Sequence, residues 1–339
     1  MWTALAVSVA LSRGSARMCA LPPGAHPTDV WPAAAPIREL LNAEAWLACD
    51  MKLRVCGVLG EGRFGTVLLG EGESGDVAVK VAQCPLAGLE REAAVLRAMQ
   101  GAIGFPALIH YEETCSLLVM ERLGLSLQQI WETESCSTHL PASYVLRVGR
   151  DALRRLRQLH HAGYAHNDMK PANLLLGAEG GSREAELHLI DFGLASALGA
   201  DNMRETDGPN EAVFSSQGGG SKVERVGTPM YASIAAHEGR RTRAVDDVES
   251  LVYCLAFLAA GHLPWERKPH SRALFWKRKM VTDGCEVLTD SCAAERLTEE
   301  IHSTEAAMAL QALWAQVVEC HSTAAAVDYE ACLAALGDD

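Results

Sequence analysis

The sequence lacks any apolar run of the roughly 18 residues that are needed to span a bilayer. The longest candidate, Leu251–Ala260, is short and predicts a buried core helix. Basic residues are also scarce: 30 Lys and Arg stand against 43 Asp and Glu, for a net charge of −13. This balance argues against general nucleic-acid binding and against adhesion to anionic membranes, so we expect neither type of partner.

Paired cysteines are missing as well. None of the 11 cysteines lies in a CxxC pair or at metal-finger spacing with histidine. We therefore predict reduced, mostly buried thiols in an intracellular protein, either cytoplasmic or nuclear.

Residues 1–35 contain no acidic residue before Asp29 and are rich in Ala, Ser and Pro. This composition favours a disordered extension; the alternative is an organellar targeting segment, because Arg13 and Arg17 occur in an acid-poor start. The whole chain of 339 residues exceeds the usual size of one domain, so one two-lobed domain or two domains are expected.

The segment 166–173, which reads HNDMKPAN, concentrates an acid, a cation and an amide within eight residues. Pro171 disfavours a helix there, and a loop would let the three polar groups converge. Asp168 can accept or orient a hydroxyl proton, Lys170 can neutralise developing phosphate charge, and Asn173 offers a hard oxygen to Mg²⁺. The alternative is a buried aspartate that caps a turn.

A second carboxylate suited to Mg²⁺ follows in the Asp191-Phe192-Gly193 turn. Asn173 and Asp191 are therefore the predicted metal ligands. Together with Asp168 and Lys170 they form the predicted catalytic set, which matches a known template for phosphoryl transfer.

A glycine loop, 60–67, reads GEGRFGTV and is followed by β-favouring residues, not by a helix. The context of strand, loop and strand favours a hairpin that covers phosphates over a dinucleotide-binding turn. Lys80 ends the next alternating strand, where it can reach inward. A helix is predicted over 89–99, with Glu92 as the partner of Lys80 and Glu90 as a competing candidate.

These motifs together resemble the protein kinase fold, and specifically the casein kinase 1 superfamily, including the vaccinia-related kinases. The segments 227–233 (GTPMYAS), 246–251 (DDVESL) and 263–265 (LPW) carry the finer resemblance. It covers about residues 50–335 and implies an α+β fold of two lobes. A small β-rich lobe with one main helix spans about 50–121, a hinge spans 121–124, and a larger, mainly helical lobe spans about 125–335.

The resemblance also implies roles at matching positions. Asp247 would brace the catalytic loop, and Met120 would be the gatekeeper beside the adenine. ATP, with Mg²⁺, would be contacted by Leu59, Gly60, Gly62, Gly65, Val67, Ala78, Lys80, Glu92, Met120, Glu121, Leu123, Leu175 and Ile190. The implied activity is transfer of the γ-phosphate to Ser or Thr of protein substrates by a monomeric enzyme.

Two departures bear on regulation and substrate choice. Asn167 replaces the Arg often found before the catalytic Asp, and Met230 replaces the Arg of the family's GTxRYAS segment. A stretch without acids contains Arg267, Lys268, Arg272, Lys277, Arg278 and Lys279. It is either a solvated helix face or a patch that faces the substrate cleft and favours acidic or phosphorylated sites.

Two rival functions remain open at this point. One is a kinase-like phosphotransferase for small molecules, and the other is a pseudokinase that acts as a scaffold. The segments GTPMYAS and DDVESL favour a protein substrate over the first rival. Retention of Lys80, Glu92, Asp168, Asn173 and Asp191 argues against the second.

Overall fold

The computed structural model describes residues 53–62, 65–72, 75–82, 88–113, 117–133, 140–199, 227–283 and 304–337. The extension 1–35, the loop residues 63–64 and most of the segment after the Asp-Phe-Gly turn lie outside the described residues. No helix in the described ranges is long and apolar enough to cross a membrane. The described residues form two compact units, one from the ranges within 53–82 and 109–121, and one from those within 88–108 and 122–337.

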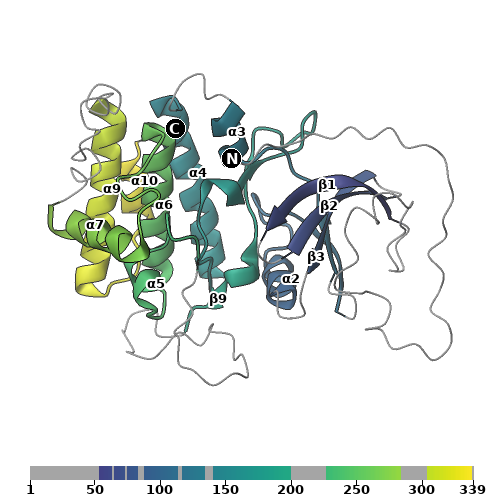
Figure 1. Ribbon diagram of the computed structural model, residues 1–339, viewed down its shortest axis with the longest axis horizontal. Coiled ribbons are helices and arrows are strands. Elements are labelled where there is room, and N and C mark those ends of the chain that lie inside the picture. Colours follow the sequence, from purple (N-terminus) through teal and green to yellow (C-terminus); the bar gives the residue numbers. More distant parts are fainter. Residues whose placement is uncertain are drawn as a thin grey trace. The chain divides into compact units, whose positions relative to one another are not determined.

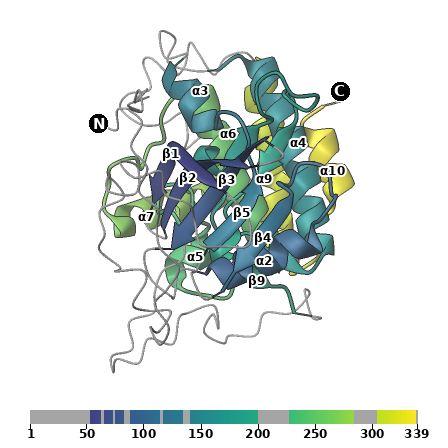
Figure 2. The same cartoon turned by 90° about the vertical axis from the view of Figure 1, so that its right-hand side faces the viewer.

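The first unit is built on a sheet of five strands, ordered β1-β2-β3-β5-β4 and seen side by side in Figure 2. The strands are β1 (Arg54–Gly62), β2 (Gly65–Gly72), β3 (Gly75–Ala82), β4 (Leu108–Glu112) and β5 (Leu117–Glu121). The expected hairpin is present, because β1 and β2 pair up to Gly62 opposite Gly65.

One face of this sheet forms an apolar core, because apolar side chains recur at every second position of its strands. The core consists of Leu53, Val55, Leu68, Val77, Val79, Val81, Leu117 and Val119. Successive side chains of a strand point to opposite faces, so Ala78 and Lys80 lie on the other face. The alternation thus places the apolar core on one face of the sheet and Lys80 on the other.

The second unit is mainly helical, and Figure 1 shows α6 with α4 and α9 alongside it. Its helices are α2 (Leu89–Ala98), α3 (Leu127–Thr133), α4 (Ala142–His161), α5 (Ile234–Glu238), α6 (Ala244–Ala260), α7 (His270–Asp283), α9 (Thr304–Thr323) and α10 (Tyr329–Ala335). Contacts place α2 in this unit, whereas the sequence grouped it with the small lobe. A β-sheet part and a helical part confirm the expected α+β fold.

Helix α6 is the centre of the second unit. Every residue from Val245 to Ala259 is buried, which is typical of a helix that is packed on all sides. The backbone N–H of Arg243 donates to Asp246 Oδ2 over 2.7 Å at its start, and Gly261, with φ of 77°, ends it. Gly261 takes a left-handed conformation that costs other residues more.

Two short ladders hold the loops between the helices. Strand β6 (Tyr164–Ala165) pairs with β9 (Ser196–Ala197), and β7 (Leu174–Leu176) pairs with β8 (Leu187–Leu189). The catalytic segment therefore lies between β6 and β7, while the Asp-Phe-Gly turn lies between β8 and β9. Each ladder joins a strand that flanks the catalytic segment to a strand that flanks the Asp-Phe-Gly turn, so the two loops are held next to each other.

Candidate active site

Asp168 is the polar centre of the catalytic loop. Its Oδ2 accepts a hydrogen bond from Lys170 Nζ at 2.5 Å, and its Oδ1 accepts from the backbone N–H and the hydroxyl of Thr228, both at 2.9 Å. The side chain is 4% exposed, whereas Lys170 is only partly buried. The loop therefore brings Asp168 and Lys170 together as the sequence predicted, and it adds Thr228.

The contact of Thr228 with Asp168 was not predicted. Thr228 stands in the GTPMYAS segment, 60 positions beyond Asp168. Its hydroxyl also accepts from Lys170 Nζ at 3.3 Å. The one available signal was a hydroxyl residue directly after Gly227, whose φ of 88° lets the backbone turn toward the catalytic loop.

Asn173 connects the catalytic loop to the second carboxylate. Its Nδ2 donates to the backbone oxygen of Asp168 at 2.9 Å, so its Oδ1 is the atom left for a cation. Its own backbone oxygen accepts from the N–H of Ile190 at 3.1 Å, which holds Asp191 beside it. Asn173 ends a single 3-10 turn, Pro171–Asn173, where Pro171 is tolerated at the first position.

The donor set fits a magnesium ion. Amide and carboxylate oxygens are the ligands that Mg²⁺ takes from proteins, and the two residues lie on adjacent loops of one unit. Asp191 adopts φ of 65°, a left-handed conformation that is uncommon for residues other than glycine. Phe192 in the turn that follows is fully buried and stacks on Phe105 with ring centroids 5.9 Å apart.

Asp247 holds the catalytic loop from beneath. Its Oδ2 accepts from the backbone N–H of His166 at 2.6 Å, and its Oδ1 accepts from that of Asn167 at 2.8 Å. Burial raises the pKa of this carboxyl, but hydrogen bonds from His160 and the backbone of His166 outweigh burial and lower the pKa overall. The geometry is the brace that the resemblance implied.

The brace extends further than the sequence indicated. His160 Nε2 donates to Asp247 Oδ2 at 2.8 Å, and His160 Nδ1 is hydrogen-bonded to the hydroxyl of Tyr329 on α10. A chain of polar contacts thus runs from the C-terminal helix through α4 to the catalytic loop. Single residues separated by 169 positions carry no motif, so the sequence offered no signal for this contact.

Asn167 connects three segments through one side chain. Its Nδ2 donates to the oxygen of Leu194 and to Ser196 Oγ, both at 2.9 Å, while its Oδ1 accepts from Thr242 Oγ1 at 2.5 Å. Its φ of 68° is left-handed, which Asn adopts more readily than most residues. The side chain that replaces the usual Arg is therefore a neutral, fully used hydrogen-bonding group.

Four residues that are predicted to contact the nucleotide share one face of the sheet in the first unit. Val67 pairs with Lys80 across β2 and β3, and Ala78 pairs with Met120 across β3 and β5. Cross-strand partners point to the same side, so the sheet brings these four side chains together. Glu121 ends β5 next to Met120.

The glycines of the hairpin differ in what they require. A Cβ at Gly65, where φ is 157°, would collide with the carbonyl oxygen of Val81, whereas one at Gly60 would meet no atom within 4 Å. Gly60 and Gly62 pair with Val67 and Gly65, so three of these four paired positions carry no side chain. That arrangement suits a loop that approaches phosphates closely. Leu59 lies at a register shift and is 41% exposed.

The remaining residues that are predicted to contact the nucleotide lie in the second unit. Glu92 is 1% exposed on α2, whereas the competing Glu90 is exposed, and this difference supports Glu92. Leu175 lies in β7, Ile190 directly precedes Asp191, and Leu123 lies in the segment before α3. Arg91 fixes α2 to the Asp-Phe-Gly turn through a 3.1 Å hydrogen bond to the oxygen of Gly193.

The expected basic patch needs a correction. Lys277 is fully buried, so it belongs neither to a solvated helix face nor to a surface that contacts substrate. Arg278 is paired with Glu238 at 2.5 Å and Lys279 with Asp283 at 3.7 Å. The helical period explains the error, because one position of a basic run on α7 faces the core while its neighbours face solvent.

A sheet unit with a glycine hairpin and a helical unit with this catalytic loop define a protein kinase. The family model of the protein kinase domain matches residues 53–320. The casein kinase 1-like protein HD16 of Oryza sativa subsp. japonica is 34% identical over 257 residues, which cover 70% of this chain and 34% of the relative. A probable casein kinase I homolog of Encephalitozoon cuniculi is 29% identical over 216 residues, 61% of this chain and 66% of the relative.

The chain belongs to the protein kinase family, and these relatives support a place among the casein kinase 1 kinases within it. It spans about a third of the length of the rice relative and just under two thirds of the length of the other.

Proposed function

We propose that this protein is a serine/threonine kinase that transfers the γ-phosphate of ATP to protein substrates. The observation that carries the proposal is the placement of Lys170 and Thr228 on the two oxygens of Asp168. A lysine two residues after the catalytic aspartate is typical of Ser/Thr kinases. Relatives named as casein kinase 1 proteins support the same activity.

Each side chain of the site has a role in this reaction. Asp168 orients the substrate hydroxyl and takes its proton, while Lys170 lies beside the same carboxylate and offsets charge on the transferred group. Asn173 and Asp191 would hold Mg²⁺, which when bound neutralises phosphate charge. Lys80, with Glu92 as its partner, would hold the nucleotide phosphates, and Glu121 and Leu123 would contact adenine through their backbones.

Transfer of labelled γ-phosphate tests the proposal against both rivals. The purified protein is incubated with casein, and in parallel with a free aminoglycoside and with choline. Labelled casein supports a protein kinase. Labelling of a small molecule alone would instead indicate a small-molecule phosphotransferase. Nucleotide binding without any transfer would indicate a scaffold.

Phosphorylation of the activation segment is not expected to be required. In many kinases an Arg before the catalytic Asp pairs with a phosphate there, and that pair orders the segment. Asn167 is neutral, and its amide is already bonded to Leu194, Ser196 and Thr242. Enzyme treated with phosphatase should keep most of its rate toward casein; mock-treated enzyme is the control. If the rate falls to background after phosphatase treatment, a phosphate on the activation segment is required and pairs with a cation at a position other than 167.

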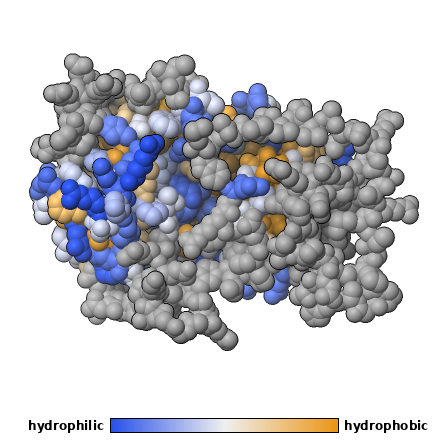
Figure 3. Space-filling model, viewed as in Figure 1, coloured by the Kyte–Doolittle hydropathy of each residue, from blue (hydrophilic) through white to orange (hydrophobic). Residues whose placement is uncertain are grey.

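We further propose a preference for acidic or phosphorylated substrates. Three exposed cations, Arg267, Lys268 and Arg272, form what we call the basic patch, and Figure 3 shows hydrophilic side chains gathered over the end of the unit that carries α7. The side chain of Arg267 is 92% exposed. In a chain of net charge −13, such a patch creates a local positive field that attracts anionic peptides. We also propose that the enzyme acts as a monomer.

Charge reversal tests the basic patch. The triple variant Arg267→Glu, Lys268→Glu and Arg272→Glu should raise KM for an acidic peptide by about tenfold at low salt, with kcat and KM for ATP nearly unchanged. The difference should shrink as ionic strength rises, because salt screens exposed charges. Arg97→Glu on α2 is a charge-reversal control. An unchanged KM in the triple variant would show that the basic patch is a solvated surface without a role in substrate binding.

A further inference from the structure

Lys277 is bound beneath the end of the activation segment. Its Nζ donates to the backbone oxygens of Ala232 at 2.6 Å and Pro229 at 3.1 Å, and it lies 3.0 Å from His237 Nε2. Both oxygens belong to residues 229–232, which follow Thr228 directly.

Two histidines complete the polar surroundings of Lys277. Nε2 of His237 lies 3.0 Å from Nζ of Lys277 and 3.0 Å from the oxygen of Pro229, so the imidazole and the lysine meet at the same carbonyl. Nδ1 of His237 lies 2.9 Å from Nδ1 of His270, whose Nε2 lies 3.1 Å from the oxygen of His237. The ring of His237 therefore connects Lys277 to His270 and to the end of the activation segment.

An aromatic floor closes the site of Lys277. Its Nζ lies 4.6 Å from the ring centre of Tyr253 and 5.3 Å from that of Trp265, distances at which a ring face attracts a cation. Trp265 also donates from Nε1 to the oxygen of Met230 at 2.8 Å. Burial lowers the pKa of Lys277 to about 7, with the charge of Glu249 acting in the opposite direction.

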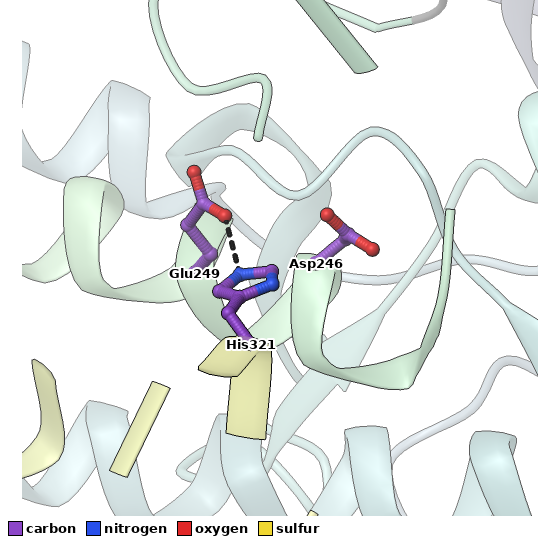
Figure 4. Close-up of side chains that lie close together, drawn as sticks. All are labelled: Asp246, Glu249 and His321. Carbon is purple, nitrogen blue, oxygen red and sulfur yellow. Dashed lines mark hydrogen bonds and ion pairs between the residues drawn. The ribbon is translucent and has the colours of Figure 1, made fainter. Parts of the chain in front are cut away.

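Glu249 fixes the next part of the segment with the opposite charge. Its Oε1 accepts from the backbone N–H of Ile234 at 2.7 Å and from the hydroxyl of Tyr253 at 2.8 Å. Its Oε2 lies 2.9 Å from Nε2 of His321 on α9, as Figure 4 shows. The residue is fully buried, so two buried charges, one from α6 and one from α7, hold 229–234 by its backbone.

The same cluster invites a reading as a metal site, because ligand atoms of Asp246, Glu249 and His321 lie within 4.8 Å of one another (Figure 4). Arg243 Nη2 lies 3.0 Å from Nδ1 of His321. A guanidinium can only donate, so Nδ1 accepts from Arg243 and Nε2 faces the carboxylate of Glu249. The positive charge of Arg243 beside this ring disfavours a metal cation there, so we assign these residues to holding Glu249.

We propose that Lys277 is a positioning residue, a cation built into α7 that holds residues 229–232 so that Thr228 meets Asp168. The path is short: Lys277 binds the oxygen of Pro229, the residue next to Thr228, and Thr228 donates twice to Asp168 Oδ1. In this role Lys277 orders the segment without a phosphate. The inference rests on the proposed kinase function, but its structural part does not need activity.

Hydrogen exchange measures the positioning directly. In Lys277→Met, backbone amides over 227–238 should exchange about tenfold or more faster than in the wild type, while amides of α4 and α9 keep their protection. Lys279→Met, two residues along the same helix, is the matched control and should leave 227–238 unchanged. Unaltered exchange in Lys277→Met would overturn the inference, whether or not the protein transfers phosphate.

Kinetics then separate positioning from general damage. Lys277→Met should lose between about tenfold and about a hundredfold in kcat/KM for casein, while nucleotide affinity stays at the wild-type value. Lys277→Arg keeps the charge and the donors and can stack on both rings, so it should restore part of the rate. If the amides of α4 and α9 also lose protection in Lys277→Met, that variant is generally destabilised, and Lys277→Arg is used in its place. If Lys277→Arg shows wild-type exchange over 227–238 but no recovery of kcat/KM, the result would contradict the positioning role.

Discussion

Asp168→Asn is expected to reduce phosphate transfer to casein by on the order of a hundredfold or more, while nucleotide still binds. The amide has the same shape and can still accept from Thr228, so the loop should keep its position. It cannot take a proton, however, and it removes the negative charge that Lys170 contacts at 2.5 Å. The residues proposed to bind nucleotide, such as Lys80, are unchanged, so nucleotide affinity should be retained.

The measurement compares single-turnover transfer with direct nucleotide binding in the same preparation. Asp191→Ala is the contrasting variant, because it removes an expected metal ligand and should weaken binding of Mg-ATP itself. Asp151→Asn, at a half-buried position on α4, is a matched control that should behave as wild type. A wild-type transfer rate in Asp168→Asn would show that the aspartate is not the catalytic group.

Asp247→Ala is expected to have the second large effect, on both stability and activity. The carboxylate accepts from the backbone of His166 and Asn167 and from His160, and all three donors would lose their partner in a buried site. Removing one member of such a buried network costs about 3–5 kcal/mol of unfolding free energy. Because the two backbone donors fix the residues before Asp168, transfer should also fall by about a hundredfold.

Denaturant unfolding and casein kinetics, measured well below the melting temperature of the variant, check this expectation. Asp283→Asn, an exposed position at the end of α7, supplies the control for loss of one carboxylate. A variant that is destabilised but still turns over at the wild-type rate would limit Asp247 to a structural role. Unchanged stability would mean that water replaces the lost acceptor.

Local motifs made much of the site predictable. Asp168, Lys170 and Asn173 lie within six positions, so their convergence depends mainly on one short loop. The alternation of β3 similarly placed Ala78 and Lys80 on one face, since side chains of a strand repeat every two residues. Roles of individual residues in binding and catalysis remain predictions, which the variants above test.

Contacts between distant segments were not predictable in the same way. Thr228, His160 with Tyr329, and Glu249 with His321 join positions 60 to 169 residues apart. The burial of Lys277 was not predictable either, because the sequence of the basic run does not show which of its lysines faces the core. The packing of α7 against Tyr253 and Trp265 determines that this lysine is Lys277.

By itself, the sequence determined the order of the elements, the kinase family and the chemical groups of the catalytic loop, because each depends on residues close together in the chain. Tertiary structure decided which groups hold that loop in place. Helices α6 and α7 bring Asp247, Glu249 and Lys277 beneath the loop and the activation segment, where burial away from water makes each buried charge seek specific partners. Long-range packing sets those partners, so only the folded chain assigns Lys277 to the activation segment and Asp247 to the catalytic loop.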